Sequence, residues 1–199
     1  VWQEQRLAAP ECDGVIDALT FLEQVKQRKM TAVPKRVAVL AGGDCAMDAA
    51  TTAKNLGAEE LFLVFGGPRS EMHWHMSEEW FSTPGVQAMM HRQPTGYDLA
   101  DDGTLAGLQI HDTELGSDSV LPVGLVVEAM GLESCPSLRQ TLAGIEMGGD
   151  RNLIQIDAHF RTKLDRVFAT GGITNGGASV ARCVAEGHLA AEQIHLEIS

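Results

Sequence analysis

The chain has 199 residues, 44% of them hydrophobic and 21 of them glycine, which is enough to bury a core in one or two domains. Its formal net charge of −12 argues against nucleic acid and anionic membranes as partners, because both bind clustered Lys and Arg. No run approaches the ~18 to 20 consecutive apolar residues that a membrane span needs. We therefore expect a globular cytoplasmic protein, and the missing initial Met suggests a fragment.

The four cysteines lie far apart and form no Cys-x-x-Cys pair. This spacing encodes neither an iron-sulfur cluster nor a zinc ribbon within the stretch. We expect reduced, buried thiols, as is usual in the cytoplasm.

The first third of the chain has the pattern of a nucleotide-binding crossover. Helical spacing of apolar residues predicts a helix over 13–29, with Asp13 available as its N-cap. An apolar run over 36–43 that ends in glycines indicates a buried parallel strand, and the alanine-rich segment 44–57 a helix packed on the sheet. A second buried strand over 60–65 completes a β-α-β unit of about 30 residues. The pattern predicts an α/β, Rossmann-like parallel sheet.

The middle of the chain is irregular over 66–84 and strand-like after it. We expect strands over 86–94, 104–115 and 119–131, with Asp-Asp-Gly at 101–103 as a hairpin signal. These segments predict a small β-meander that covers the sheet.

The last third repeats a strand-glycine-helix pattern. A short helix over 136–144 and a strand-like segment over 152–157 come first. The run 166–172 then indicates a buried strand ending in glycines, and 175–198 a long helix with small residues on one face. This second junction is another place where a cofactor could bind.

The turn after the first predicted strand fits G-x-G-x-x-A, with Ala41 in place of the first glycine. Such a turn directs backbone N–H groups and the positive end of a helix dipole at a pyrophosphate. The candidate nucleotide-binding residues here are Gly42, Gly43, Asp44, Cys45 and Ala46. The alternative is a glycine-rich turn of purely structural kind, and the β-α-β context favours nucleotide binding over it.

The end of the second strand normally carries an acidic group for the adenosine ribose or cations for a 2′-phosphate. Phe65-Gly66-Gly67-Pro68-Arg69 offers no carboxylate, and Arg69 is the nearby cation. Arg69 is thus a candidate phosphate ligand that tilts the expectation slightly toward NADPH, and a solvated surface arginine is the alternative.

Four blocks of sequence, in order and spanning nearly the whole chain, carry a family resemblance. They are "DGVIDALTFL", "VAVLAGGDCAMDAATTAKNLGAEELFLVF", "LPVGLVVEAMGLESCPSL" and "VFATGGITNGGASVARCVAEGHLAAEQI". With these the chain resembles the small subunit of bacterial glutamate synthase and the matching half of dihydropyrimidine dehydrogenase, flavoproteins that take electrons from NAD(P)H. The resemblance implies a connecting segment at 1–14, an NAD(P)-binding domain at 15–130 and the carboxyl-terminal part of an FAD domain at 131–199.

The resemblance also implies which cofactors belong to the intact protein. FAD would bind only together with a front half that this stretch lacks, and iron-sulfur clusters would lie in that segment or in a partner redox subunit. Further cofactor contacts are implied at Gly131, Gly171, Gly172, Ala178, Ser179 and Val180.

Three departures from the family pattern affect the expected cofactors. Ala41 replaces a glycine, Phe65-Gly66-Gly67 replaces a Tyr-Arg-Arg type sequence, and Gly172 replaces an Asp that holds the flavin ribityl chain. The leading hypothesis is the NAD(P)H-binding portion of a flavoprotein oxidoreductase that passes a hydride to FAD and electrons on to iron-sulfur centres. The alternative is a cofactor-poor scaffold within a larger redox complex.

The segment "EMHWHMSEEW" at 71–80 allows three interpretations. His73 and His75 could contribute to a metal site, although no third ligand stands at a fixed spacing. The resemblance implies instead a lid over the nucleotide that uses Met72 and Trp74. An ordinary surface loop with aromatic anchors is the third possibility.

Overall fold

The computed structural model describes residues 2–4, 6–7, 12–40, 43–72, 81–134, 140–149, 152–177 and 179–199. The chain divides into two compact units. The first, here called the sheet unit, is Gln5–Gly131, and the second, the helix unit, is Val1–Glu4 with Leu132–Ser199.

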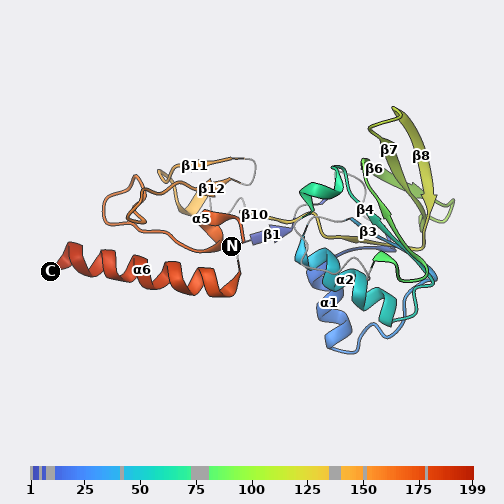
Figure 1. The fold of residues 1–199 in the computed structure, drawn as a ribbon, viewed down its shortest axis with the longest axis horizontal. Helices are drawn as coiled ribbons and strands as arrows, with labels where there is room; N and C mark the ends of the chain where they lie inside the picture. The colour runs from blue at the N-terminus through green and yellow to red at the C-terminus, as the bar shows by residue number, and fades with distance from the viewer. Residues whose placement is uncertain are drawn as a thin grey trace. The chain divides into compact units, whose positions relative to one another are not determined.

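A five-stranded parallel sheet forms the centre of the sheet unit (Figure 1). Its order is β2 (Val15–Asp17), β9 (Leu125–Glu128), β3 (Arg36–Leu40), β4 (Glu60–Val64) and β5 (Val86–Met89). Every neighbouring pair is parallel. The apolar runs of β3, β4 and β9 are buried, as strands covered on both faces require. The predicted α/β fold with a parallel sheet is confirmed.

Helices α1 (Ala18–Lys26) and α2 (Asp44–Asn55) cover one face of this sheet. The small side chains of α2 allow it to approach the strands closely, and the buried residues of this layer form one apolar core. That core contains Ala18, Phe21, Val37, Val39, Ala46, Ala49, Ala50, Ala53, Ala58, Leu61, Leu63, Leu125, Val127 and Ala129.

An antiparallel meander covers the opposite face of the sheet (Figure 1). It consists of β6 (Arg92–Leu99), β7 (Leu105–Asp112) and β8 (Ser117–Pro122). Leu108 and Ile110 of β7 pack with sheet residues such as Phe62 in a second core. A meander is therefore present and the sheet unit has three layers, but the expected strand 119–131 is divided, and its second part, β9, pairs in the parallel sheet instead.

Several boundaries differ from the sequence expectations. Val15–Asp17 is a strand, because its apolar residues extend the sheet beside β9, and the N-cap of α1 is Asp17 instead of Asp13. The Asp17 carboxylate accepts a hydrogen bond from Thr20 N–H at 2.8 Å. The expected strand 86–94 is divided near His91, whose φ of 56° turns the chain from the parallel sheet into the meander.

The helix unit contains short strand pairs and one long helix. Its elements are β1 (Trp2–Glu4), β10 (Leu132–Ser134), β11 (Met147–Gly148), β12 (Leu153–Ile154), α5 (Gly172–Asn175) and α6 (Val180–Ile198). Strand β1 pairs with β10 and strand β11 with β12, both antiparallel. In the described part of the chain, no helix has the length and apolarity needed to cross a membrane.

The expected strand 166–172 is wrong. Arg161 and Phe168 form an isolated bridge in this region, and Gly172 begins α5. A buried parallel strand needs neighbours to pair with, and the described residues of the helix unit supply none for this segment. Of the expected helix 136–144, residues 136–139 lie outside the described residues, 140 and 141 are helical, and 142–144 form a turn.

Helix α6 begins at Val180, five residues after its predicted start. Ser179 is its N-cap, and the Ser179 hydroxyl accepts a hydrogen bond from Arg182 N–H at 3.3 Å.

Candidate functional site

The strand order of the parallel sheet reverses at β3. The chain continues from β3 through α2 to β4 on one side, whereas β9 lies on the other side of β3. Ligands of open α/β sheets bind outside the carboxyl ends of the strands at such a reversal. The predicted glycine turn connects Leu40, the last residue of β3, to Asp44, the first residue of α2. Ala41 and Gly42 lie outside the described residues.

Gly43 is the N-cap of α2 and faces open space. Its φ of 174° and ψ of −158° are extended backbone that any residue adopts, so conformation does not require a glycine here. Within the described residues, a Cβ on Gly43 would have no atom within 4 Å. No side chain among the described residues caps the helix, so none of these neutralises the positive end of its dipole as a capping group. The geometry suits the close approach of an anionic ligand.

The other predicted residues of this turn occupy the first turn of α2. Asp44 is exposed, Cys45 is half-buried, and Ala46 is fully buried against the sheet. Cys12, Cys45 and Cys183 form no disulfide within the described residues, and each is half-buried where the sequence led us to expect buried thiols. Gly43, Asp44, Cys45 and Ala46 are thus brought together at the carboxyl edge of the sheet.

The end of β4 lies next to this turn, because Val64 of β4 is in register with Leu40 of β3. The backbone beyond β4 is held by hydrogen bonds from Arg92 N–H to the Phe65 carbonyl at 2.9 Å and from His91 N–H to the Gly67 carbonyl at 3.2 Å.

A short 3-10 helix, η1 (Arg69–Glu71), follows and turns back toward the glycines. The Arg69 guanidinium stacks over the ring of Phe81, 4.2 Å from its centroid. A Cβ on Gly67 would lie 2.7 Å from Glu71 Oε2. Residues 65–69 themselves offer no carboxylate, but η1 brings that of Glu71 next to Gly67 from four residues on.

A buried carboxylate, Glu128, ends strand β9 and is 1% exposed. It accepts hydrogen bonds from Arg6 Nε at 2.6 Å, from Leu7 N–H at 2.7 Å and from the Tyr97 hydroxyl at 2.6 Å. Burial and the bond to Glu128 raise the pKa of Tyr97 above its usual range, so this phenol remains a donor. Three donors offset the cost of burying the charge. The cluster fastens the segment at residues 6–7 to the end of β9.

Sequence reasoning missed Glu128, although a carboxylate inside the apolar run 125–131 is a signal that could have found it. Gly131, a predicted cofactor contact, follows at the end of the sheet unit with φ 111°. Because glycine adopts a positive φ more readily than other residues, this backbone conformation favours glycine at position 131.

The second glycine junction is built from α5 and the start of α6. Gly171 is buried, has φ 75° and precedes Gly172, the first residue of α5. The Glu186 carboxylate of α6 accepts hydrogen bonds from Gly171 N–H at 3.3 Å and from the Asn175 amide at 2.8 Å. The bond from Arg182 is the largest of the contacts that lower the pKa of Glu186. Glu186 was not predicted, and it fixes the junction.

The remaining predicted residues of this junction are Ser179 and Val180, at the N-cap and first position of α6. Val180 is 81% exposed. Ala178 lies outside the described residues. Gly171 and Gly172 thus lie at the start of α5, and Ser179 and Val180 at the start of α6, with Gly171 N–H bonded to Glu186 of α6.

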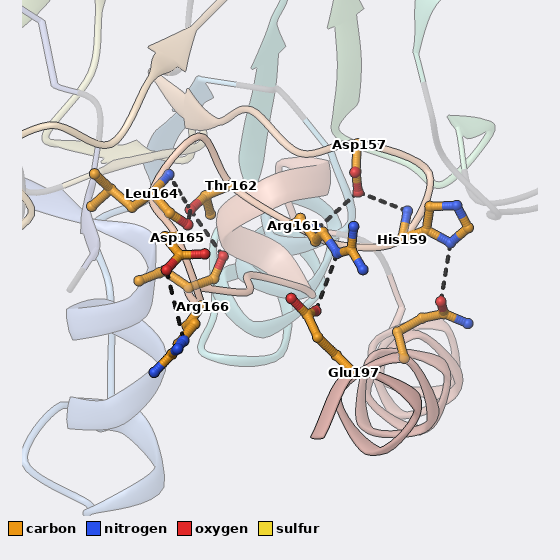
Figure 2. Close-up of polar contacts among 10 residues, drawn as sticks. Asp157, His159, Arg161, Thr162, Leu164, Asp165, Arg166 and Glu197 are labelled. Atoms are coloured by element: carbon orange, nitrogen blue, oxygen red, sulfur yellow. Dashed lines mark hydrogen bonds and ion pairs between the residues drawn. The ribbon is translucent and has the colours of Figure 1, made fainter. Parts of the chain in front are cut away.

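The loop before α5 is tied to α6 by polar contacts (Figure 2). The Asp157 carboxylate accepts hydrogen bonds from His159 N–H at 2.8 Å and from Arg161 N–H at 2.9 Å, which lower the pKa of Asp157. Arg161 Nε donates to Glu197 at 3.2 Å, and the His159 ring contacts the Gln193 amide at 3.0 Å. These contacts hold the loop on the carboxyl-terminal half of α6.

Apolar side chains of α6 nevertheless face solvent. They are Val180, Val184, Leu189, Ile194, Leu196 and Ile198. A hollow of about 700 Å³ opens beside the end of α6 and is lined by Asp165, Arg166, Phe168, Ile194, Glu197 and Ile198. This helix carries more apolar surface than the described residues cover.

The predicted metal and lid residues His73, Trp74 and His75 lie outside the described residues. Met72, at the carboxyl end of η1, packs against the helix-side core. Across the ranges that the structure describes, no three His, Cys, Asp or Glu residues gather as a metal site would need.

Comparison with known proteins gives relatives of both expected kinds. Glutamate synthase [NADPH] small chain of Escherichia coli (strain K12) is 27% identical over 216 residues, covering 92% of this chain and 45% of the relative. NAD-dependent dihydropyrimidine dehydrogenase subunit PreT of the same organism is 26% identical over 185 residues, covering 89% and 41%. The chain thus spans less than half the length of these two relatives.

A solved structure shows the same fold. The crystal structure of T. acidophilum thioredoxin reductase matches with a TM-score of 0.79 at 19% identity, covering 100% of this chain and 64% of that one. At this identity the similarity supports the fold alone.

The family follows from the sequence match. Residues 4–187 match the profile of the pyridine nucleotide-disulphide oxidoreductases, a range that includes both glycine junctions. The resemblance to the glutamate synthase small subunit and to dihydropyrimidine dehydrogenase is confirmed. The chain therefore belongs to the pyridine nucleotide-disulphide oxidoreductase family.

Proposed function

We propose that this chain is the nicotinamide-nucleotide-binding portion of a flavoprotein oxidoreductase. Residues 15–130 would bind NAD(P)H, and 131–199 would form the carboxyl-terminal part of the FAD domain. NAD(P)H supplies a hydride that FAD accepts, and electrons would pass on to iron-sulfur centres in a segment or partner outside this chain. Family membership supports the reaction class.

The observation that carries the proposal is the open space at Gly43. Neither the backbone conformation of Gly43 nor packing against the residues that the structure describes explains a glycine at this position. A pyrophosphate placed there would meet the uncapped amino end of α2, where the helix dipole favours negative charge. The residues of the turn would position the nucleotide, and Ala46 would hold the helix close to the sheet.

The exposed face of α6 supports the assignment of 131–199 to a larger domain. Six apolar side chains of this helix are solvent-accessible, and related proteins are more than twice as long as the aligned region. We propose that polypeptide of the intact protein covers this face and completes the FAD site around Gly171 and Gly172.

Substitution of Gly43 tests the nucleotide site without disturbing the fold. Gly43→Val adds a side chain where the described residues place no atom within 4 Å, so the midpoint of thermal unfolding should fall by no more than about 5 °C, the cost of a less favourable N-cap residue. The same side chain would occupy the place of the pyrophosphate, and NADH and NADPH affinity should fall by at least about 10-fold. Calorimetric titration of the chain with each nucleotide measures both affinities.

Gly187→Val is the matched control, because a Cβ on Gly187 in α6 also has no atom within 4 Å. This variant should bind nucleotide like the unsubstituted chain. If no saturable binding of either nucleotide occurs at millimolar concentration, the proposal is wrong and the scaffold alternative stands. If the Gly43→Val variant bound NADH and NADPH with unchanged affinity, the nucleotides would bind at a site other than the Gly43 turn.

A further inference from the structure

The surface beyond the end of β4 presents polar oxygen atoms where the chain itself has two glycines. A Cβ on Gly67 would lie 2.7 Å from Oε2 of Glu71, and a Cβ on Gly66 would lie 2.6 Å from Oε1 of Gln93. The ends of these two exposed side chains thus occupy the space that side chains at 66 and 67 would otherwise fill. The Glu71 carboxylate therefore lies where a side chain of residue 67 would lie, and the Gln93 amide oxygen where a side chain of residue 66 would lie.

Backbone hydrogen bonds of η1 set the course of the chain at Glu71. Glu71 N–H donates to the Pro68 carbonyl at 3.0 Å, and Met72 N–H donates to the Arg69 carbonyl at 3.1 Å. The turn therefore returns the chain toward Gly67, whose own carbonyl accepts from His91 N–H at 3.2 Å. Backbone hydrogen bonds thus hold both Gly67 and the η1 turn that carries Glu71.

The glycine pair at 66–67 follows the end of β4, which lies close to the proposed nucleotide site. Val64 is in register with Leu40, so the end of β4 lies one strand away from the turn that would bind the pyrophosphate. In nucleotide-binding β-α-β units the group at this point meets the adenosine ribose. A carboxylate accepts hydrogen bonds from ribose hydroxyls, whereas a 2′-phosphate carries about −1.5 to −2 charges and requires cations.

The two nearby arginines each make a contact within the chain. The Arg69 guanidinium stacks on Phe81 at 4.2 Å, and Arg92 Nη2 pairs with the Asp112 carboxylate at 2.9 Å. Among the described residues, the oxygen nearest to a Cβ built on Gly67 is Oε2 of Glu71.

We propose that Glu71 recognises the adenosine ribose and that the chain binds NADH in preference to NADPH. This inference rests on the proposed function and specifies its substrate. It reverses the slight preference for NADPH that the sequence position of Arg69 suggests.

Direct binding to the 199-residue chain tests the inference without any flavin turnover. Calorimetric titration should give an NADH dissociation constant at least about 10-fold below that of NADPH. Glu71→Gln should weaken NADH by about 10- to 150-fold, the range expected for a lost charged hydrogen bond, and should not weaken NADPH. Glu71→Arg should reverse the preference, because the new cation pairs with the 2′-phosphate.

Glu59→Gln is the matched control, since Glu59 precedes β4 at the opposite edge of the sheet and is also exposed. It should leave both affinities unchanged. Tighter binding of NADPH, with loss of that binding in Arg69→Gln and no effect of Glu71→Gln, would overturn the inference and leave the proposed function standing. Failure of both nucleotides to bind would overturn both proposals together.

Discussion

Helices α2 and α6 are both rich in alanine, yet their surroundings differ. The twelve residues of α2 bury Ala46, Met47, Ala49, Ala50 and Ala53 between the sheet and α1. The nineteen residues of α6 bury Ala190 and leave large apolar side chains such as Leu196 and Ile198 more than 70% exposed.

The same difference separates the two units. Among the described residues, all but two of the buried apolar side chains belong to the sheet unit, and the two exceptions are Ile154 and Ala190. Because burial of apolar surface is the main stabilising contribution to folding, the sheet unit has the core of an independent domain. The described residues of the helix unit, in contrast, bury little apolar surface, as our proposal that further polypeptide covers α6 requires.

Truncation of matched leucines should give the largest difference between the units. Leu63→Ala removes a fully buried side chain of β4 and should lower the free energy of unfolding by about 3 kcal/mol. Leu189→Ala, at a position 50% exposed on α6, should change it by less than about 0.5 kcal/mol. Urea denaturation followed by circular dichroism measures both changes, and an equally large loss in Leu189→Ala would show that the face of α6 is already covered.

Removal of the buried carboxylate should have the next largest effect. Glu128→Ala leaves the Tyr97 hydroxyl and Leu7 N–H without their acceptor, so the sheet unit should lose about 2 to 3 kcal/mol of stability. Glu192→Ala removes an exposed carboxylate of α6 and is the control. Equal unfolding midpoints for the two variants in denaturant would contradict the role assigned to Glu128.

Acidification should give the smallest effect, through Asp112 of β7. Its pKa is held below the usual value by the N–H groups of Leu115 and Glu114 and by Arg92. Because the folded pKa lies below the unfolded value of about 3.9, Asp112 stabilises the fold above that pH and the contribution is lost as pH falls further.

Asp112→Asn should therefore lower the thermal midpoint at neutral pH and reduce its dependence on pH below about 4. Asp101→Asn, in the exposed β6–β7 turn, serves as the comparison. A steeper acid dependence in Asp112→Asn than in the unsubstituted chain would argue against this assignment.

Much of the sheet unit could be predicted from sequence because its signals are local. Continuous apolar runs identify β3 and β4, and the alanine-rich segment with its closing glycine identifies α2. The strand at Val15–Asp17 could not be found in this way. Three residues carry little periodicity, and their state depends on pairing with β9, more than a hundred residues later.

The same limit applies to the candidate site. Gly43 follows from a turn motif, whereas Glu71 and Glu128 function through contacts that the motif does not contain. Glu71 reaches Gly67 because η1 turns back, and Glu128 is buried because Arg6 and Tyr97 come to it from distant parts of the chain. In the helix unit the predicted strand 166–172 does not form. Among the described residues, this segment has an isolated antiparallel bridge, Arg161–Phe168, and no parallel strand beside it.

Hydrogen exchange of the chain with and without saturating NADH tests the central claim most directly, namely that the sheet unit binds the nucleotide. The account predicts slower exchange at 43–47 and 64–72, on either side of the proposed site, and unchanged exchange over 152–199. Protection confined to 152–199, or no protection anywhere at a nucleotide concentration that saturates binding, would contradict it.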